Sequence, residues 1–110
     1  MGVGTTIASA PAFEHSLKDN DIDKLVDKDG NYALLALKYP NNHLEPYMDE
    51  ETLHLHYTFH HGGAVKAANK DQQMIKKALE ENNMENVDYW TKKLSFHLSS
   101  HILHSIFWTN

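Results

Sequence analysis

The stretch Phe-His-Leu-Ser-Ser-His-Ile-Leu-His-Ser-Ile-Phe-Trp-Thr, residues 96–109, decides the fold expected for this chain. On a helix, residues three or four positions apart lie on one face. Here that spacing gathers imidazoles and apolar side chains into a single stripe, made of Leu94, His97, His101, His104 or Ser105, and Trp108. We therefore expect a long helix with one face rich in histidine.

A second group of histidines lies earlier in the chain, in His54-Leu-His56-Tyr-Thr-Phe-His60-His61. The residues before it predict the start of a helix, because Asp49 is a good N-cap and two acidic residues follow in the first turn. The helical period then places one set of residues on a common face: Leu53, His56, Tyr57, His60 and Ala64.

Glycines and asparagines predict where this first helix is interrupted. Gly62-Gly63 in its interior costs about 1 kcal/mol per glycine relative to alanine, so either the helix bends there or another backbone approaches closely. Asn69-Lys-Asp71 suggests a break, followed by a short helix over residues 72–81 that Asn82-Asn83 closes. The last helix is expected to begin at Asn86.

The expected fold class is all-α, a long antiparallel helical hairpin over residues 37–110 preceded by a mostly irregular extension over residues 1–36. Asp29-Gly30-Asn31 in that extension is a turn signal.

No apolar run approaches the length of a membrane span, and neither a signal peptide nor a basic transit peptide is recognisable at the start. A mitochondrial or cytoplasmic location is expected.

The composition excludes several classes of function. All ten basic residues are lysine and the net charge is -5, which disfavours nucleic acid as a partner. The absence of cysteine removes disulfides, thiolate metal sites and cysteine nucleophiles. Glycine-rich phosphate loops and the Gly-x-Ser-x-Gly elbow are also absent.

Nine histidines in 110 residues remain as the chemistry-bearing feature. The pairs His56/His60 and His97/His101 are four residues apart, and His101/His104 are three apart, so two imidazoles from one helix can reach one ion. A single histidine on an apolar face is more often a hydrogen-bonded core residue. Two facing clusters favour a shared metal site, because desolvating several imidazoles is costly unless their lone pairs are bound. Zinc, iron and manganese all suit such ligands.

Two motifs in register resemble the iron/manganese superoxide dismutase family. His101-Ile-Leu-His104-Ser-Ile-Phe-Trp108 is similar to the family signature His-x-Asn-His-Ser-x-Phe-Trp. Leu44-Glu-Pro46, followed by His56-Tyr-Thr-Phe-His60-His61, resembles the first family helix, whose pattern is Leu-Glu-Pro and then His-His-x-x-His-His. The resemblance covers about residues 37–110.

The resemblance implies a metal centre that disproportionates superoxide to dioxygen and hydrogen peroxide, with manganese or iron as the metal. Carried over by position, His56 and His104 are the two metal ligands. His60 and His61 match the pair near the substrate funnel, and Trp108 matches the aromatic wall beside the metal. The other ligands, an Asp and a His, belong in this family to a carboxy-terminal α/β domain whose motif is not found in these residues.

Three departures from the family pattern leave catalysis open. Ala64 stands where the family has a funnel tyrosine, Ser99-Ser100 replaces a Gly-Gly, and Leu103 replaces the Asn before the second ligand. One alternative is a non-catalytic dismutase-fold subunit of a larger assembly, such as a mitochondrial one, with no metal. Another is a zinc- or haem-binding helical protein with only local likeness. In each case we expect an oligomer or a member of a complex, partnered by a carboxy-terminal domain or other subunits.

Overall fold

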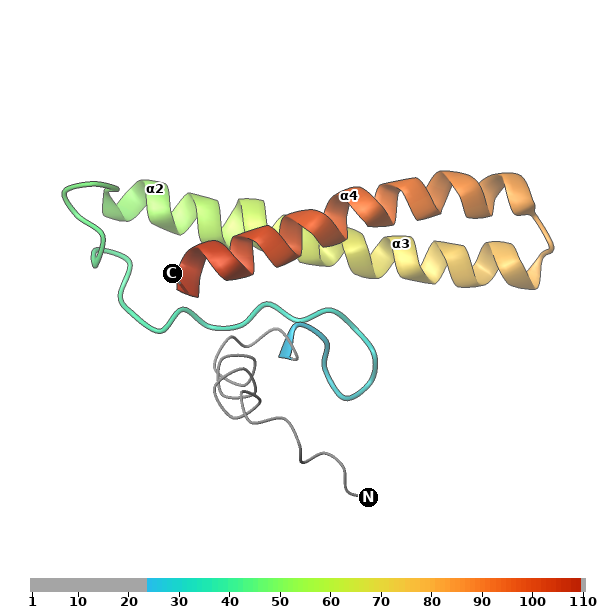
Figure 1. Cartoon of the computed structure of the whole chain (residues 1–110), viewed down its shortest axis with the longest axis horizontal. Helices are drawn as coiled ribbons and strands as arrows, with labels where there is room; N and C mark the ends of the chain where they lie inside the picture. Colours follow the sequence, from blue (N-terminus) through green and yellow to red (C-terminus); the bar gives the residue numbers. More distant parts are fainter. Residues whose placement is uncertain (1–23, 110) are drawn as a thin grey trace, which may run out of the picture.

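The computed structural model describes residues 24–109, which form two long antiparallel helical arms joined at one end (Figure 1). The first arm is continuous and consists of α2 (Glu50–Leu55), the π-helical η3 (His56–His61) and α3 (Gly62–Glu80). The second arm is α4 (Met84–Thr109). Residues 24–109 contain no strand, only an isolated bridge between Val26 and Tyr32. The all-α hairpin predicted from the sequence is confirmed.

The first arm begins as the sequence predicts. The Asp49 side chain accepts a hydrogen bond from the Thr52 backbone N–H at 2.7 Å, and Glu50 and Glu51 occupy the first turn. The cap satisfies one of the N–H groups that have no partner within the helix. The hydrogen bond from the Thr52 backbone also lowers the pKa of the Asp49 carboxyl, helped by one from the Thr52 side chain, because both favour the charged form.

The predicted break at Asn69-Lys-Asp71 is wrong, since α3 passes through these residues without interruption. Their polar side chains make tertiary contacts instead of capping a helix. The Asn69 amide accepts from the Tyr32 N–H at 2.7 Å and donates to the Tyr32 carbonyl at 3.0 Å. The Asp71 carboxylate accepts from the His97 ring at 2.6 Å. The short helix expected over residues 72–81 is therefore the end of α3.

The connection between the arms follows the asparagine signal closely. Asn82 has the left-handed φ of 56°, which stops α3. Asn83 then caps α4, its side chain accepting from the Asn86 N–H at 3.1 Å. The last helix therefore begins at Met84, two positions before the predicted start at Asn86, because Asn83 and not Asn86 supplies the cap.

The π-helical η3 is a feature that the sequence did not predict. It ends immediately before Gly62, where a Cβ atom would lie 3.5 Å from the Leu34 side chain. One interpretation of the Gly-Gly pair was that the backbone of another segment approaches it closely. Outside the first arm, the neighbour of Gly62 is instead the side chain of Leu34. At Gly63 such a Cβ would have nothing within 4 Å apart from its neighbours in sequence and the backbone of its own helix.

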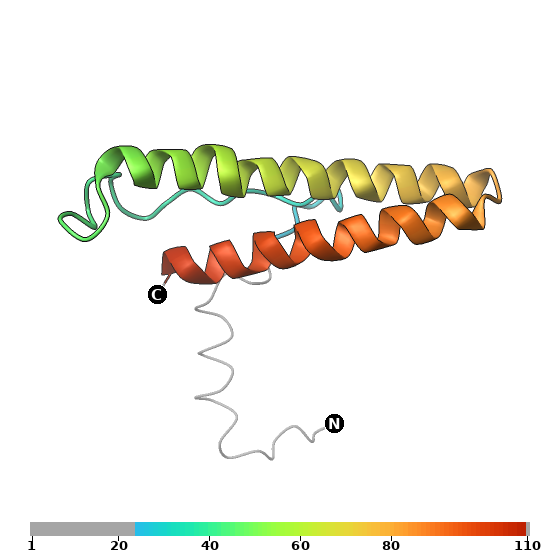
Figure 2. The ribbon, with the colours of Figure 1, turned by 90° about the horizontal axis from the view of Figure 1, so that it is seen from above.

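The segment of residues 25–39, here called the strap, lies along the hairpin (Figure 2). It begins with the predicted turn, in which Gly30 has a φ of 85°. Further on, the Tyr57 hydroxyl donates to the Leu35 carbonyl, and the Tyr39 hydroxyl donates to the Trp108 carbonyl at 3.0 Å. The strap is therefore anchored to both arms. The predicted extension also includes residues 1–23, which lie outside the described residues, and its boundary at residue 36 stays a prediction.

The core of the hairpin combines small and large side chains. Its buried apolar members are Leu25, Leu53, Ala64, Val65, Ala68, Ala78 and Trp108. The alanines let α3 approach α4 closely, while three polar side chains, His61, Asp71 and His101, are buried among them. No helix within residues 24–109 has the length and apolar character needed to cross a membrane.

We expect Asn69→Ala to destabilise the fold by about 1–3 kcal/mol, because the Tyr32 N–H and carbonyl lose their partner in a half-buried position. Urea unfolding followed by circular dichroism measures the change. Gln73→Ala, on the exposed face of α3, is the control and should change stability by less than about 0.5 kcal/mol. Equal effects of the two substitutions would show that the strap is not held by Asn69.

Candidate metal centre

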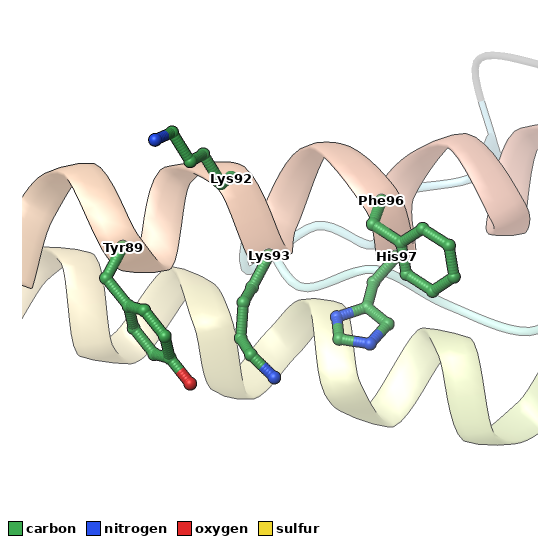
Figure 3. A pocket seen from close by; sticks show the side chains of 5 residues that line it. All are labelled: Tyr89, Lys92, Lys93, Phe96 and His97. Carbon is green, nitrogen blue, oxygen red and sulfur yellow. The ribbon is translucent and has the colours of Figure 1, made fainter.

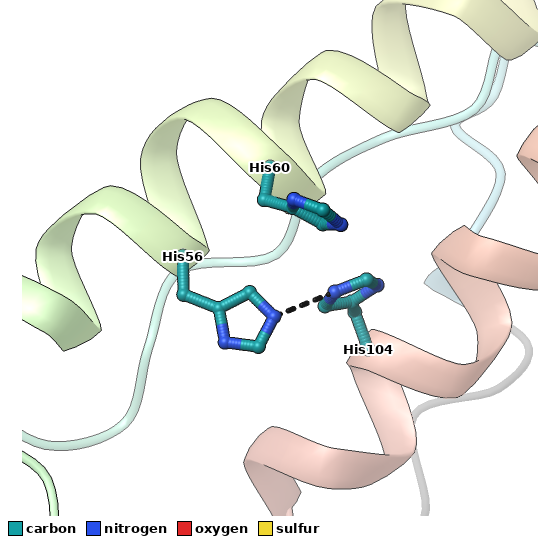
Figure 4. Close-up of side chains that lie close together, drawn as sticks. All are labelled: His56, His60 and His104. Carbon is teal, nitrogen blue, oxygen red and sulfur yellow. Dashed lines mark hydrogen bonds between the residues drawn. The ribbon is translucent and has the colours of Figure 1, made fainter.

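Three histidines from the two arms converge on one point (Figure 4). His56 and His60 come from η3 and His104 from α4, and one ring nitrogen of each lies within 4.8 Å of the other two. The Nε2 atoms of His56 and His104 are 2.9 Å apart. The sequence predicted that residues 56 and 104 would meet, and the structure places them together.

The orientation of His104 is set by its own helix. Its Nδ1 lies 2.7 Å from the Ser100 carbonyl one turn earlier, so Nδ1 carries the proton and donates it. The Ser100 hydroxyl lies 3.2 Å from the same nitrogen. Nε2 therefore presents a lone pair toward His56. A histidine that ligates a metal almost always donates its other N–H to a carbonyl or carboxylate in this way.

His60 and Trp108 form the surroundings of this pair. The exposed His60 ring lies 5.2 Å from His56 and 5.1 Å from His104, measured between ring centroids. The buried Trp108 indole meets the His56 ring edge to face at 5.4 Å. Both residues singled out from the sequence thus lie beside the His56/His104 pair, one at its open side and one at its buried side.

Two further histidines are buried beside the cluster. His61 and His101 are 2% and 0% exposed, and the Nε2 of His61 lies 2.8 Å from the Nδ1 of His101. The resemblance grouped His61 with His60 near the substrate funnel. The structure separates them, because adjacent residues on a helix project about 100° apart, so His60 stays at the surface while His61 turns into the core. The bond from Trp108 Nε1 to His61 Nδ1, at 3.0 Å, was not foreseen.

Burial keeps several of these imidazoles neutral. Desolvation lowers the pKa of His61 to about 4, and the neighbouring His101, His104 and His56 add to the effect. Desolvation likewise lowers the pKa of His56, helped by charge repulsion from His104 and His60, and that of His101. A neutral imidazole is the form that binds a metal ion.

The remaining histidines of the two predicted clusters lie elsewhere. His54 is exposed, with its Nδ1 3.4 Å from the Thr58 hydroxyl. His97 donates from Nδ1 to the buried Asp71 carboxylate and lines a groove on α4 (Figure 3). The other residues of this groove are Tyr89, Lys92, Lys93 and Phe96. Neither histidine reaches the cluster.

The donor set fits a single metal ion of the kind the sequence indicates. Two imidazole nitrogens bound at about 2.1 Å and at right angles lie about 3.0 Å apart, close to the 2.9 Å between Nε2 of His56 and of His104. Imidazole ligands suit zinc, iron and manganese. No carboxylate belongs to this cluster of described residues, so other groups must complete the coordination shell.

Comparison with known proteins decides the family. The model of the alpha-hairpin domain of iron/manganese superoxide dismutases matches residues 31–110, six residues more than the resemblance covered. This chain belongs to the iron/manganese superoxide dismutase family. The described residues are a superoxide dismutase-like helical hairpin, and at the level of the family the metal is iron or manganese.

Several curated dismutases are similar to this dismutase-family chain. The probable iron superoxide dismutase of Bacillus subtilis is 39% identical over 79 residues, which cover 72% of this chain and 28% of the relative. The iron superoxide dismutase of Pyrobaculum aerophilum is 42% identical, with coverage of 72% and 37%. The mitochondrial manganese superoxide dismutase of Aspergillus fumigatus is 34% identical, with coverage of 72% and 38%. The match therefore spans well under half the length of each relative.

The lowered pKa of His61 predicts that the fold weakens in mild acid. The unfolded chain protonates this residue near pH 6.5, whereas the folded chain does so only near pH 4. Stability is therefore greatest above pH 6.5 and falls as the pH drops toward 4, with His61 contributing about 3 kcal/mol over that range. Urea unfolding between pH 4.5 and 7.5, on chain treated with a chelator, measures this dependence.

The matched substitutions are His61→Gln and His54→Gln. His61→Gln should lose part of the pH dependence, because the unfolded chain no longer gains this proton. His54→Gln, at an exposed histidine, should keep the dependence of the parent chain. If both variants retain the same slope, His61 is not the group responsible.

Proposed function

We propose that this chain supplies half of a superoxide dismutase centre, in which His56 and His104 bind one iron or manganese ion. A carboxy-terminal α/β domain outside these 110 residues completes the ligand shell. The observation that carries the proposal is the 2.9 Å separation of the two Nε2 atoms, with His104 already turned toward the shared point by the Ser100 carbonyl.

Held by His56 and His104, the metal would supply the one-electron redox chemistry by which two superoxide ions and two protons become dioxygen and hydrogen peroxide. The residues of this chain position and shield that centre. His56 and His104 provide neutral nitrogen ligands from opposite arms. Trp108 closes the buried side, and its ring keeps water from the His56 imidazole.

His60 lies at the side from which substrate arrives. Its ring is exposed yet within 5.2 Å of both ligand rings, measured between centroids. An imidazole at the mouth of such a site can shape the entry path and exchange protons with solvent. We therefore assign His60 to the funnel and not to the first ligand set, although its nitrogen lies near enough to join the cluster.

Exposed apolar side chains next to the cluster support completion by another domain. Phe59 and Leu103 directly adjoin His60 and His104 in sequence and are 67% and 65% exposed. Leu55 and Phe107 are each 49% exposed, and the Phe107 ring lies 6.0 Å from that of His56. Large apolar side chains left in water around a polar site favour burial by a partner.

A second candidate is a non-catalytic dismutase-fold subunit of a larger assembly, for example in mitochondria. The observation that favours it is Ala64, a buried residue at the position where the resemblance expects a funnel tyrosine. Without that hydroxyl the proton relay of the family would lack one member. A chain found only within a large complex, with no metal after purification, would favour this candidate over the first.

Substituting the ligands tests the proposed centre. We expect the chain purified from medium containing iron and manganese to retain metal in elemental analysis. His56→Ala and His104→Ala should each lower metal affinity at least roughly tenfold, because each removes one protein ligand. Superoxide consumption, measured with the carboxy-terminal domain of a family member added, should fall in parallel.

His54→Ala is the matched control, since it removes an exposed imidazole from the same arm. It should leave metal content and superoxide consumption unchanged. Metal binding that survives both ligand substitutions, or that His54→Ala also abolishes, would contradict the proposed ligands. Circular dichroism of each variant separates loss of ligand from loss of fold.

A further inference from the structure

A chain of three hydrogen bonds runs through the core from Trp108 to the strap. The Trp108 Nε1 lies 3.0 Å from the His61 Nδ1, the His61 Nε2 lies 2.8 Å from the His101 Nδ1, and the His101 Nε2 lies 3.3 Å from the Leu25 carbonyl. All four residues are buried. Followed along the hydrogen bonds, these residues belong to α4, η3, α4 again and the strap.

The direction of every bond in this chain is fixed by its two ends. An indole N–H only donates, so the His61 Nδ1 must accept and the proton of the neutral ring lies on Nε2. The His101 Nδ1 must then accept that proton's bond, which leaves its own proton on Nε2. This proton meets the Leu25 carbonyl, which only accepts. Both imidazoles are thereby held in a single tautomer.

Two members of this hydrogen-bond chain also pack against the two proposed metal ligands. The His61 ring stacks on His104 with centroids 5.1 Å apart and planes 21° from parallel. The Trp108 ring meets His56 at 5.4 Å. Each ligand ring thus rests against a member of the chain. A ligand ring held by packing and by fixed hydrogen bonds loses less freedom when it binds a metal.

The far end of the chain connects the centre with the strap. The Leu25 carbonyl also accepts from the Ala33 N–H at 2.8 Å, which closes the turn around Gly30. Asn69 of α3 holds this turn through two hydrogen bonds, one with the backbone N–H and one with the carbonyl of Tyr32. The position of the strap is therefore transmitted to the two rings that flank the ligands.

We propose that His61 and His101 are positioning residues, which lock the Trp108 indole and the His104 ring in place through this one-directional chain and couple the metal centre to the strap. The effect on metal binding rests on the proposed function. The existence of the hydrogen-bond chain does not rest on the proposed function, since none of its bonds involves a metal.

The first test is nuclear magnetic resonance of the whole, metal-free chain with ¹⁵N-labelled histidine at neutral pH. Two-bond proton–nitrogen correlations distinguish the tautomers. We expect both His61 and His101 to carry the proton on Nε2 and to have an unprotonated Nδ1. A protonated Nδ1 on either residue would overturn the proposal, because the chain would then have no consistent direction.

The second test uses His101→Leu, with His54→Leu as the matched control. Without its acceptor the His61 ring is no longer fixed, so the Trp108 indole proton should exchange with water at least roughly tenfold faster. The dissociation constant for Mn²⁺, measured by calorimetry, should rise roughly 10- to 100-fold, as for other groups that orient metal ligands. His54→Leu should change neither, and His101→Asn, which keeps an acceptor near the Nδ1 position, should lie closer to the parent chain.

The outcomes separate the two proposals. If the parent chain binds Mn²⁺ and folded His101→Leu binds it equally well, the positioning role is wrong and the metal centre stands. If the parent chain binds no Mn²⁺ even with the carboxy-terminal domain of a family member added, the metal centre is wrong and the indole exchange rate decides the positioning role alone. An unchanged exchange rate in His101→Leu overturns it. Should His101→Leu not fold, His61→Gln is measured in its place, because it removes the ring that joins Trp108 to His101.

Discussion

The structure depends on several imidazoles being packed between two helices, with a hydrogen-bond partner for each buried ring nitrogen. A buried imidazole without partners is costly, and a charged one more so. Here the cost is met by specific bonds: His104 uses the Ser100 carbonyl, His97 the Asp71 carboxylate, and His61 and His101 use one another. What remains is a pair of Nε2 atoms 2.9 Å apart that can share an ion.

The same requirement explains the path of the strap. A hairpin of two helices has no third layer, and few large apolar side chains are buried in it. The strap supplies what the arms lack, namely carbonyl groups for His101 and Tyr57 and the buried side chain of Leu25. The long arms and the irregular segment therefore form one unit around the histidines.

Much of this was readable from the sequence. The helical period, the Asp49 cap and the asparagines at residues 82 and 83 gave the hairpin, and the motifs at His56 and His104 gave the family. Two features were not readable, and both depend on tertiary contacts. Asn69 and Asp71 look like helix-ending residues until their partners, Tyr32 and His97, are known. The π-helical geometry of η3 is the second such feature, since no local sequence pattern predicts it.

That π turn has a consequence for which changes of length the first arm tolerates. An α-helix advances about 100° per residue, so the extra residue per turn in η3 sets α2 and α3 out of phase by about one such step. Removing one residue between His56 and His61 would restore a regular screw, but it would also rotate α2, and with it the fully buried side chain of Leu53, relative to α3. Single-residue deletions in this turn should therefore be far less tolerated than substitutions of its exposed residues.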